Sequence, residues 1–282
     1  MEDQLEGIIL DWAGTTLDYG CYAPAVVFVE IFNRAGVPIS MEEARRPMGA
    51  HKRVHIQRIT EIPDVKERWS TVNGKYPTED DVDKLFKDFV PLQLECLADY
   101  ADLIPGTLEA VKRFRAMGLK IGSTTGYLPD MMNILKSQAV WRGYIPDSSV
   151  CAGDVPEGRP APWMCYKNAE NLRIYPMHKL VKVGDTVPDI LEGKNAGMWT
   201  IGLAKTGNEM GLNLEEVSEL EREAPEKYKI RLEMAYGRLR GAGANFVVDE
   251  IGNVPEVLVK INEMLRNPQN DYGLEEHFRM GS

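Results

Sequence analysis

The fold of this chain is decided by the stretch IILDWAGTT, residues 8–16. Its apolar start predicts a short buried strand, and Asp11 stands where that strand ends. Gly14 and the two threonines after it supply a tight turn whose backbone N–H groups suit a small anion. Ligands of open α/β sheets collect at the carboxyl ends of the strands, so Asp11 is well placed for chemistry. On its own, the pattern fits an aspartate that caps the next turn equally well.

Size and composition narrow the class of protein. The 282 residues, 44% of them hydrophobic, are enough for one large domain or two. The net charge of −10 argues against a nucleic-acid or anionic-membrane partner, because both need a basic face. No apolar run approaches the roughly 18 residues of a membrane helix, and the acidic start is not a secretory signal. The four scattered cysteines form no C-x-x-C pair, which predicts a reduced, cytoplasmic protein without a zinc site.

The order of the predicted elements separates a helical segment from an alternating one. Residues 21–100 are helical and strand-poor, with helices expected at 25–35, after a capping box at Ser40, at 51–60 and after Thr78, where Pro91 is a kink. From residue 104 onward, strands alternate with helices and short loops, which predicts a parallel sheet covered on both faces. These strands are expected at 119–123, 149–152, 180–183, 199–203 and 245–248, with a charged, mostly helical excursion at 205–244.

The residues that follow these strands are polar, and in a parallel sheet they meet at one edge. They are Asp11, Thr125 and Asp185, joined by Arg159 from a loop and by Asp189 one helical turn further on. Two carboxylates brought together need a cation, and hard oxygen ligands suit Mg²⁺. Thr125 and the N–H of Gly126 suit phosphoryl oxygens, while Arg159 offers positive charge where a transferring group is most anionic. Taken singly, Thr125 also fits a turn hydroxyl, Arg159 a surface charge and Asp185 a helix cap. The occurrence of all of them in this order along the chain favours a functional site.

Four motifs resemble those of the haloacid dehalogenase superfamily: DWAGT at 11–15, STTG at 123–126, Arg159, and GD at 184–185 followed by Asp189. The resemblance implies a Rossmann-like core, an aspartate nucleophile at Asp11, and Mg²⁺. It also matches the helical segment to the cap domain of that superfamily. We therefore expect an α/β fold, with a Rossmann-like parallel-sheet core at 1–20 and 101–268, an inserted all-helical cap at 21–100, and a C-terminal tail at 269–282.

Ala13 departs from the phosphatases of this superfamily, which carry an aspartate there to protonate the leaving alkoxide. General acid catalysis contributes ~10²–10⁴ in rate, and alanine has no proton to donate. Its backbone carbonyl still suits a metal, so the expected ligands are Asp11, Ala13 and Asp185, with Asp189 behind them. The chain is therefore either inactive or cleaves a bond whose leaving group is not an alkoxide.

A basic patch surrounds Lys52. Met48, Lys52 and His55 fall at i, i+4 and i+7, so they share one face if the segment is helical. A lysine of pKa ~10.4 is less than about 0.1% neutral at pH 7. Partial burial and neighbouring cations are expected to lower that pKa by ~2–3 units, and activated lysines form Schiff bases with carbonyl substrates. The neighbouring cations are Arg45, Arg46 and Arg53. The structural alternative is a solvated helix face.

Further motifs resemble the phosphonoacetaldehyde hydrolase (phosphonatase) family over nearly the whole chain: PMG at 47–49, Lys52, His55, STTGY at 123–127 and GRPAPWM at 158–164. The resemblance implies hydrolysis of the carbon–phosphorus bond of phosphonoacetaldehyde, in the degradation of 2-aminoethylphosphonate. Lys52 forms an imine with the aldehyde, and Asp11 takes the phosphoryl group. The leaving group is then a carbon, which accounts for Ala13.

The same resemblance assigns secondary roles and a homodimer formed through the caps. Met48, His55 and Tyr127 surround the Schiff base, Thr125, Gly126 and Arg159 bind substrate, and Cys21 lies near the hinge, where packing is the simpler role. Two alternatives stay open. A metal-independent dehalogenase of the superfamily needs neither Asp185 nor Lys52. A non-catalytic regulator that holds phosphate or metal would not need Asp11 as a nucleophile.

Overall fold

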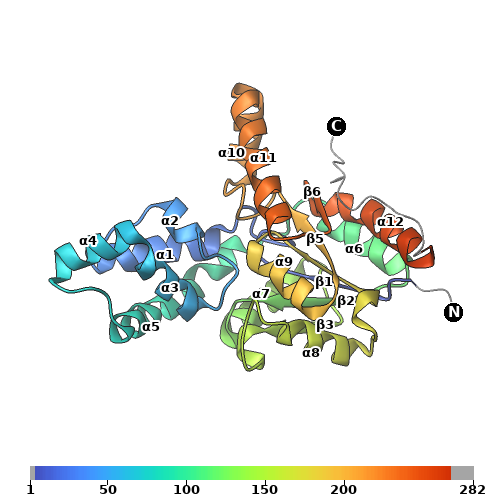
Figure 1. The fold of residues 1–282 in the computed structure, drawn as a ribbon, viewed down its shortest axis with the longest axis horizontal. Helices are drawn as coiled ribbons and strands as arrows, with labels where there is room; N and C mark the ends of the chain where they lie inside the picture. The colour runs from blue at the N-terminus through green and yellow to red at the C-terminus, as the bar shows by residue number, and fades with distance from the viewer. Residues whose placement is uncertain (1–3, 268–282) are drawn as a thin grey trace.

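The strands form one parallel, six-stranded sheet in the order β3-β2-β1-β4-β5-β6. This computed structural model describes residues 4–267, so the expected tail at 269–282 lies outside the described residues. β1 lies between β2 and β4 in the middle of the sheet (Figure 1). The strands are β1 (Gly7–Leu10), β2 (Lys120–Thr125), β3 (Ser148–Cys151), β4 (Leu180–Gly184), β5 (Trp199–Leu203) and β6 (Phe246–Val248).

Both faces of the sheet are covered. Ile8 and Leu10 pack into the hydrophobic cluster that includes α6 and α12, whereas Ile9 packs into the cluster with α8 on the other face. This alternation is the two-residue period of a strand, and burial on both faces explains why β1 is apolar throughout. The helices of this part are α6 (Thr107–Ala116), α7 (Pro129–Trp141), α8 (Trp163–Leu172), α9 (Val187–Ala196), α10 (Leu214–Glu223), α11 (Pro225–Gly241) and α12 (Val254–Arg266).

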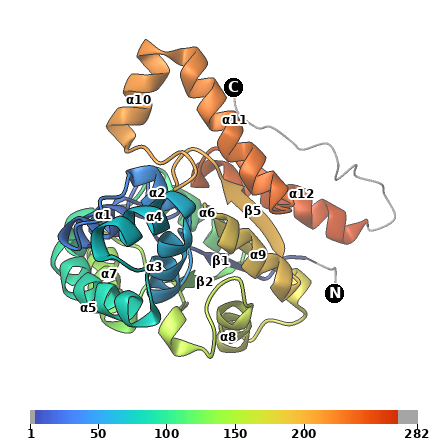
Figure 2. The same ribbon diagram turned by 60° about the vertical axis from the view of Figure 1, so that its left-hand side comes forward.

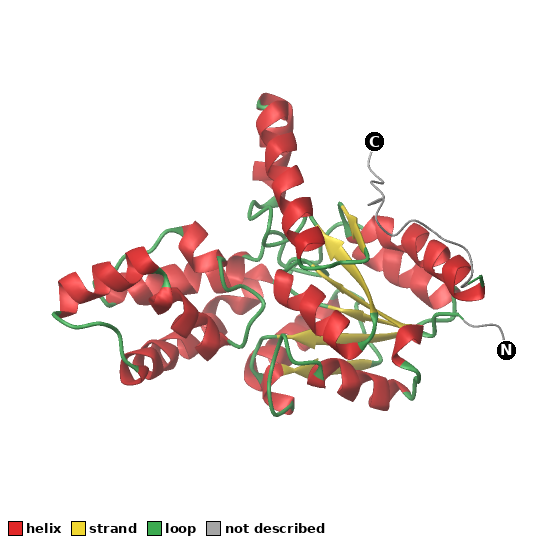
Figure 3. Cartoon of the chain, viewed as in Figure 1, coloured by secondary structure: helices red, strands yellow, loops and turns green. Residues whose placement is uncertain are grey.

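A lobe of helices without strands lies beside the sheet (Figure 3). It consists of α1 (Tyr22–Arg34), α2 (Met41–Arg45), α3 (Lys52–Glu61), α4 (Pro63–Asn73) and α5 (Glu79–Cys96), and we call these five helices the cap. Inside the cap, Phe28 of α1 stacks on Phe89 of α5 with ring centroids 4.6 Å apart. The expected capping box at Ser40 is present, and Thr78, the expected cap of the later helix, forms a capping box as well. The helical, strand-poor character predicted for this segment is confirmed.

Two details differ from the expectation. α4 was not predicted, because Val65 and Trp69 are its only buried residues and so leave a weak helical period. The excursion at 205–244 is helical as expected, but α10 and α11 form a hairpin that projects away from the sheet (Figure 2). None of the described helices has the length and apolarity to cross a bilayer.

Candidate active site

Asp11 is held at the end of the central strand. Its backbone N–H donates to the carbonyl of Val183 at 3.0 Å, which continues the β1–β4 ladder by one residue. Gly14 has a φ of 82°, the left-handed conformation that the predicted turn requires. The hydroxyl of Thr16 donates back to the carbonyl of Asp11 at 3.0 Å. The strand and the turn together fix the direction of a carboxylate that is only 5% exposed.

Arg159 joins Asp11 to two further carboxylates. Its Nη2 lies 2.6 Å from Asp11 Oδ1, its Nη1 2.9 Å from Asp189 Oδ1, and its Nε 2.9 Å from Glu192 Oε2. The guanidinium is almost fully buried. Burial lowers the pKa of Arg159, but these carboxylates together outweigh it and raise the pKa well above its usual value. A buried charge is tolerated when it is paired in this way. Arg159 is therefore a fixed cation beside Asp11, not the surface charge of the alternative interpretation.

Sequence reasoning missed the support behind this pair. Lys182 Nζ lies 2.5 Å from Asp189 Oδ1, and Thr124 donates its hydroxyl to Glu192 Oε2 at 3.0 Å. All four side chains are buried. The available signal was Lys182 itself, a charged residue inside the otherwise apolar strand β4. Glu192 lies three residues after Asp189 in α9, so one helix face presents both carboxylates.

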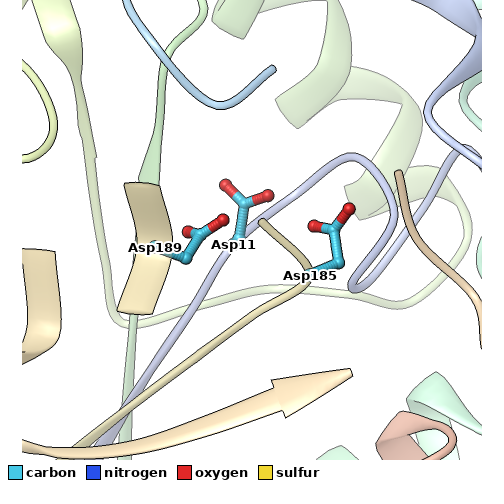
Figure 4. A group of neighbouring side chains, drawn as sticks. All are labelled: Asp11, Asp185 and Asp189. Atoms are coloured by element: carbon cyan, nitrogen blue, oxygen red, sulfur yellow. The ribbon is translucent and has the colours of Figure 1, made fainter. Parts of the chain in front are cut away.

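Three buried carboxylates gather at this edge of the sheet. Ligand oxygens of Asp11, Asp185 and Asp189 lie within 4.8 Å of one another (Figure 4). Burial raises the pKa of Asp185 well above its usual value, and the neighbouring carboxylates raise it further. Buried like charges of this kind suit a bound cation with a preference for oxygen ligands. The residues present therefore fit a divalent metal ion.

The partners of these carboxylates distinguish their roles. Asp189 already accepts hydrogen bonds from Lys182 and Thr186, and these and Arg159 oppose its burial and hold its pKa below the usual value. Asp185 accepts the backbone N–H of Asn208 at 2.7 Å and the thiol of Cys21 at 3.3 Å. This arrangement is consistent with Asp11 and Asp185 as metal ligands and Asp189 as a support.

A small cavity of about 20 Å³ lies between the cap and the sheet edge. From the sheet side it is lined by Asp11, Ala13, Thr125, Gly126, Tyr127 and Arg159. From the cap and the segment that leads into it, the lining includes Cys21, Met48 and Lys52. The structure thus brings most of the predicted site residues to one cavity, although they come from opposite sides of the molecule.

Lys52 enters this cavity as the first residue of α3. It is 4% exposed, and its Nζ lies 4.5 Å from the ring centroid of Tyr127. Burial lowers the pKa of Lys52 to about 8, against the opposing effect of Cys21 and Asp11. A shift of this size corresponds to about 3 kcal/mol against the charged form. The amine is therefore partly neutral near pH 7, as the sequence predicted.

The predicted cause of that shift was wrong in part. The three neighbouring arginines were expected to contribute, but Arg53 forms ion pairs with Glu79 and Asp83, and Arg46 lies exposed beside Glu42. The cation that does lower the pKa of Lys52 is Arg159, and burial is the larger cause. Burial is also more complete than the partial burial that we expected.

Contrary to the prediction from the sequence, Met48, Lys52 and His55 do not all lie on one face of a single helix. α3 begins at Lys52, so Met48 precedes the helix, although it still lines the cavity. His55 is not among the lining residues: its Nε2 lies 2.7 Å from the carbonyl of Ala44, and its ring stacks on Phe28 at 3.8 Å. Burial lowers the pKa of His55 well below its usual value, so it is a neutral residue behind Lys52.

Comparison with known proteins gives the family. The family model of haloacid dehalogenase-like hydrolases matches residues 5–197. The chain is 48% identical to a phosphonoacetaldehyde hydrolase from Syntrophobacter fumaroxidans, over 93% of both chains. It is 46% identical over 96% of its length to a bifunctional phosphonoacetaldehyde hydrolase/aminoethylphosphonate transaminase from Clostridioides difficile, of which it spans 43%.

A solved structure agrees with these relatives. The phosphonoacetaldehyde hydrolase-like protein from Oleispira antarctica superposes with a TM-score of 0.91 at 37% identity, over 96% of this chain and 97% of that one. The family model covers more than half of the chain, and the curated relatives are similar over nearly all of it. The chain therefore belongs to the haloacid dehalogenase-like hydrolases and, within them, to the phosphonoacetaldehyde hydrolases.

Proposed function

We propose that this chain hydrolyses the carbon–phosphorus bond of phosphonoacetaldehyde to acetaldehyde and phosphate, as a step in 2-aminoethylphosphonate degradation. The observation that carries the proposal is that Lys52, an amine of lowered pKa, and Asp11, a strand-end carboxylate, line the same cavity. One group suits an aldehyde and the other a phosphoryl group. The names of the relatives point to the same substrate.

In the first step, the neutral amine of Lys52 attacks the aldehyde carbon, one proton is taken up and water leaves, which gives a protonated imine. This cation is an electron sink two bonds from phosphorus, as C–P cleavage requires. The ring face of Tyr127 lies beside the Lys52 nitrogen and favours its positive charge. Met48 lines the same cavity and shields the imine from water.

In the second step, Asp11 attacks phosphorus and the electron pair of the C–P bond moves into the imine, which becomes an enamine. The phosphoryl group is transferred to the carboxylate as an aspartyl phosphate. Arg159 neutralises charge on the phosphoryl oxygens, and Thr125 and the N–H of Gly126 orient them. Mg²⁺, held by Asp11, Asp185 and the carbonyl of Ala13 with Asp189 behind, would supply further charge neutralisation.

In the third step, one water hydrolyses the aspartyl phosphate and restores Asp11. The enamine takes a proton on carbon, and a second water releases acetaldehyde and restores the amine of Lys52. Since imine formation released one water, the reaction consumes one water overall. No step produces an alkoxide, so the absence of a general acid at Ala13 costs this reaction nothing.

Access to the site requires the cap to move. A cavity of about 20 Å³ holds little more than one water molecule, so the described arrangement is a closed one. The two chain crossings between cap and sheet lie side by side, where the N–H of Asp18 donates to the carbonyl of Asp102 at 3.1 Å. We place the hinge there, between a cap at 21–100 and a core at 1–20 and 101–268. Cap opening then admits substrate and closure brings Lys52 to it.

Gly126 tests the need for closure. A Cβ at this position would lie 2.7 Å from the backbone oxygen of Ala50 in the cap, closer than packed atoms approach. We expect Gly126→Ala to hold the cap away and to lower kcat/KM on the order of 10²-fold, because small misplacements of reacting groups are costly. The matched control is Gly237→Ala on α11, where no atom lies within 4 Å. Equal kcat/KM for Gly126→Ala and the control would argue against a closed reacting state.

The pKa of Lys52 predicts the pH dependence of imine formation. The folded pKa of about 8 lies below the ordinary value, so the neutral amine is depleted as the pH falls below 8. The rate of imine formation should therefore rise about tenfold per pH unit up to pH 8 and then level off. Trapping with borohydride at each pH measures this step apart from phosphoryl transfer. A rise that continues to pH 10 would indicate an ordinary, solvated lysine.

The overall proposal is tested by mixing the protein with phosphonoacetaldehyde and Mg²⁺ and assaying acetaldehyde and phosphate together. We expect the two products in equal amounts and their loss on metal chelation. Turnover that persists without metal would favour a metal-independent enzyme, and binding without any product would favour a regulator. We also propose a cytoplasmic homodimer that associates through the caps; the described cysteines are all free thiols, in keeping with a reducing compartment.

A further inference from the structure

A second, larger cavity of about 610 Å³ opens beside the catalytic one. Its walls come from α2 of the cap, the start of α9, the loop after β5, and α11 of the projecting hairpin. Met48 lines both cavities, so the two are neighbours. Four arginines line this groove although the chain carries a net charge of −10: Arg45, Arg46, Arg231 and Arg238.

Two of the four arginines are neutralised locally. Arg238 lies 3.1 Å from Glu209, and Arg46 lies 3.6 Å from Glu42. Glu42 and Glu209 are the only carboxylates among the described residues that line the groove. The lining therefore keeps an excess of two positive charges, on Arg45 and Arg231.

Arg45 is buried and forms no ion pair with a described carboxylate, although the charges of Asp18 and Glu216 act on it from a distance. Its side chain belongs to a residue that is only 8% exposed, and its Nη1 is bonded to the carbonyl of Gly20 and, at 3.4 Å, to Asn208 Oδ1. Its Nη2 is buried and has no hydrogen-bond partner among the described residues. A guanidinium that is buried with neutral partners and an unused donor is costly unless an anion completes it.

Arg231 faces the same groove from the other side. Its Nε donates to the carbonyl of Met210 at 2.7 Å, and it forms no ion pair with a carboxylate among the described residues. Burial lowers the pKa of Arg231, and the positive charge of Arg45 lowers it further. The two guanidinium groups therefore act on each other. The carboxylate of Glu216 acts on both as well, but it does not line the groove and forms no ion pair with either arginine among the described residues.

We infer that this groove binds a small dianion of the phosphate or phosphonate type, held between Arg45 and Arg231. Guanidinium groups offer paired N–H donors that match the oxygens of such anions. Arg45 lies on α2 of the cap and Arg231 on α11, so the bound anion links the cap to the sheet-bearing part and favours the closed arrangement. The choice of ligand rests on the proposed function, whose substrate and product both carry this group.

The test is a calorimetric titration of the full-length protein with inorganic phosphate and, separately, with methylphosphonate, which has no aldehyde. The wild type should show two classes of site. Arg231→Gln should lose one class, or weaken it at least tenfold, whereas Arg222→Gln, an exposed arginine on α10, should keep both. Arg45→Lys keeps the charge without the planar fork and should weaken the same class.

Each anion identifies a source: tighter binding of methylphosphonate points to substrate, and tighter binding of phosphate points to product. Wild-type stoichiometry and affinity in both Arg231→Gln and Arg45→Lys would overturn the inference. Thermal unfolding checks that each variant is folded. The acetaldehyde and phosphate assay is independent of this titration, so a failure of the proposed function is seen separately.

Discussion

Lys52→Arg is expected to abolish C–P cleavage, with kcat lowered by more than about 10⁴-fold, the scale on which loss of a covalent catalyst acts. Arginine keeps a positive charge in the cavity, but its guanidinium stays protonated and forms no imine with an aldehyde. Without the imine the electrons of the C–P bond have no acceptor, whatever Asp11 does. Acetaldehyde release measures turnover, and borohydride with substrate followed by mass spectrometry measures the imine.

The same substitution on the cap surface provides the control. Lys66→Arg, at an exposed position on α4, should leave turnover and trapping at wild-type levels. Mg²⁺ binding, measured by calorimetry, should persist in Lys52→Arg. The residues that could hold the metal are Asp11, Asp185 and Asp189, and the substitution leaves all three unchanged. Appreciable turnover by Lys52→Arg, or a trapped adduct on another lysine in the wild type, would contradict the mechanism.

Much of the fold could be predicted because strands that are buried on both faces appear in the sequence as short, continuous apolar runs. The expected strand at 199–203 coincides with β5, and Ile8, Ile9 and Leu10 are apolar since each face of β1 is covered. The sequence of α4 has no comparable apolar pattern. With only Val65 and Trp69 buried, its hydrophobic period is too sparse to separate a helix from a polar loop.

The site was predictable where topology alone brings residues together. Asp11 and Asp185 follow β1 and β4, and Thr125 ends the neighbouring β2, so a parallel sheet places them at one edge. Contacts that depend on the direction in which a long side chain extends could not be predicted. Arg53 pairs with acidic residues at the start of α5, about thirty positions away in the sequence, and no local sequence pattern indicates this pairing. Burial of Lys52 depends likewise on how the cap sits on the sheet.

Asp11→Asn should separate the two halves of the reaction. The amide is close in shape to the carboxylate but is a poor nucleophile toward phosphorus, so we expect phosphate release to fall by more than about 10⁴-fold. Lys52 is untouched, so borohydride should still trap the imine. Arg159 keeps Asp189 and Glu192 as partners, which preserves its buried pairing and the fold.

Comparing the two variants separates imine formation from phosphoryl transfer. Lys52→Arg should form no imine and no phosphate, whereas Asp11→Asn should form the imine and no phosphate. Asp88→Asn, an exposed aspartate on α5, controls for the loss of one negative charge and should behave as the wild type. Phosphate release by Asp11→Asn at a rate near the wild type would mean that water attacks phosphorus directly. The strand-end carboxylate would then not be the nucleophile, even though Lys52 still formed the imine.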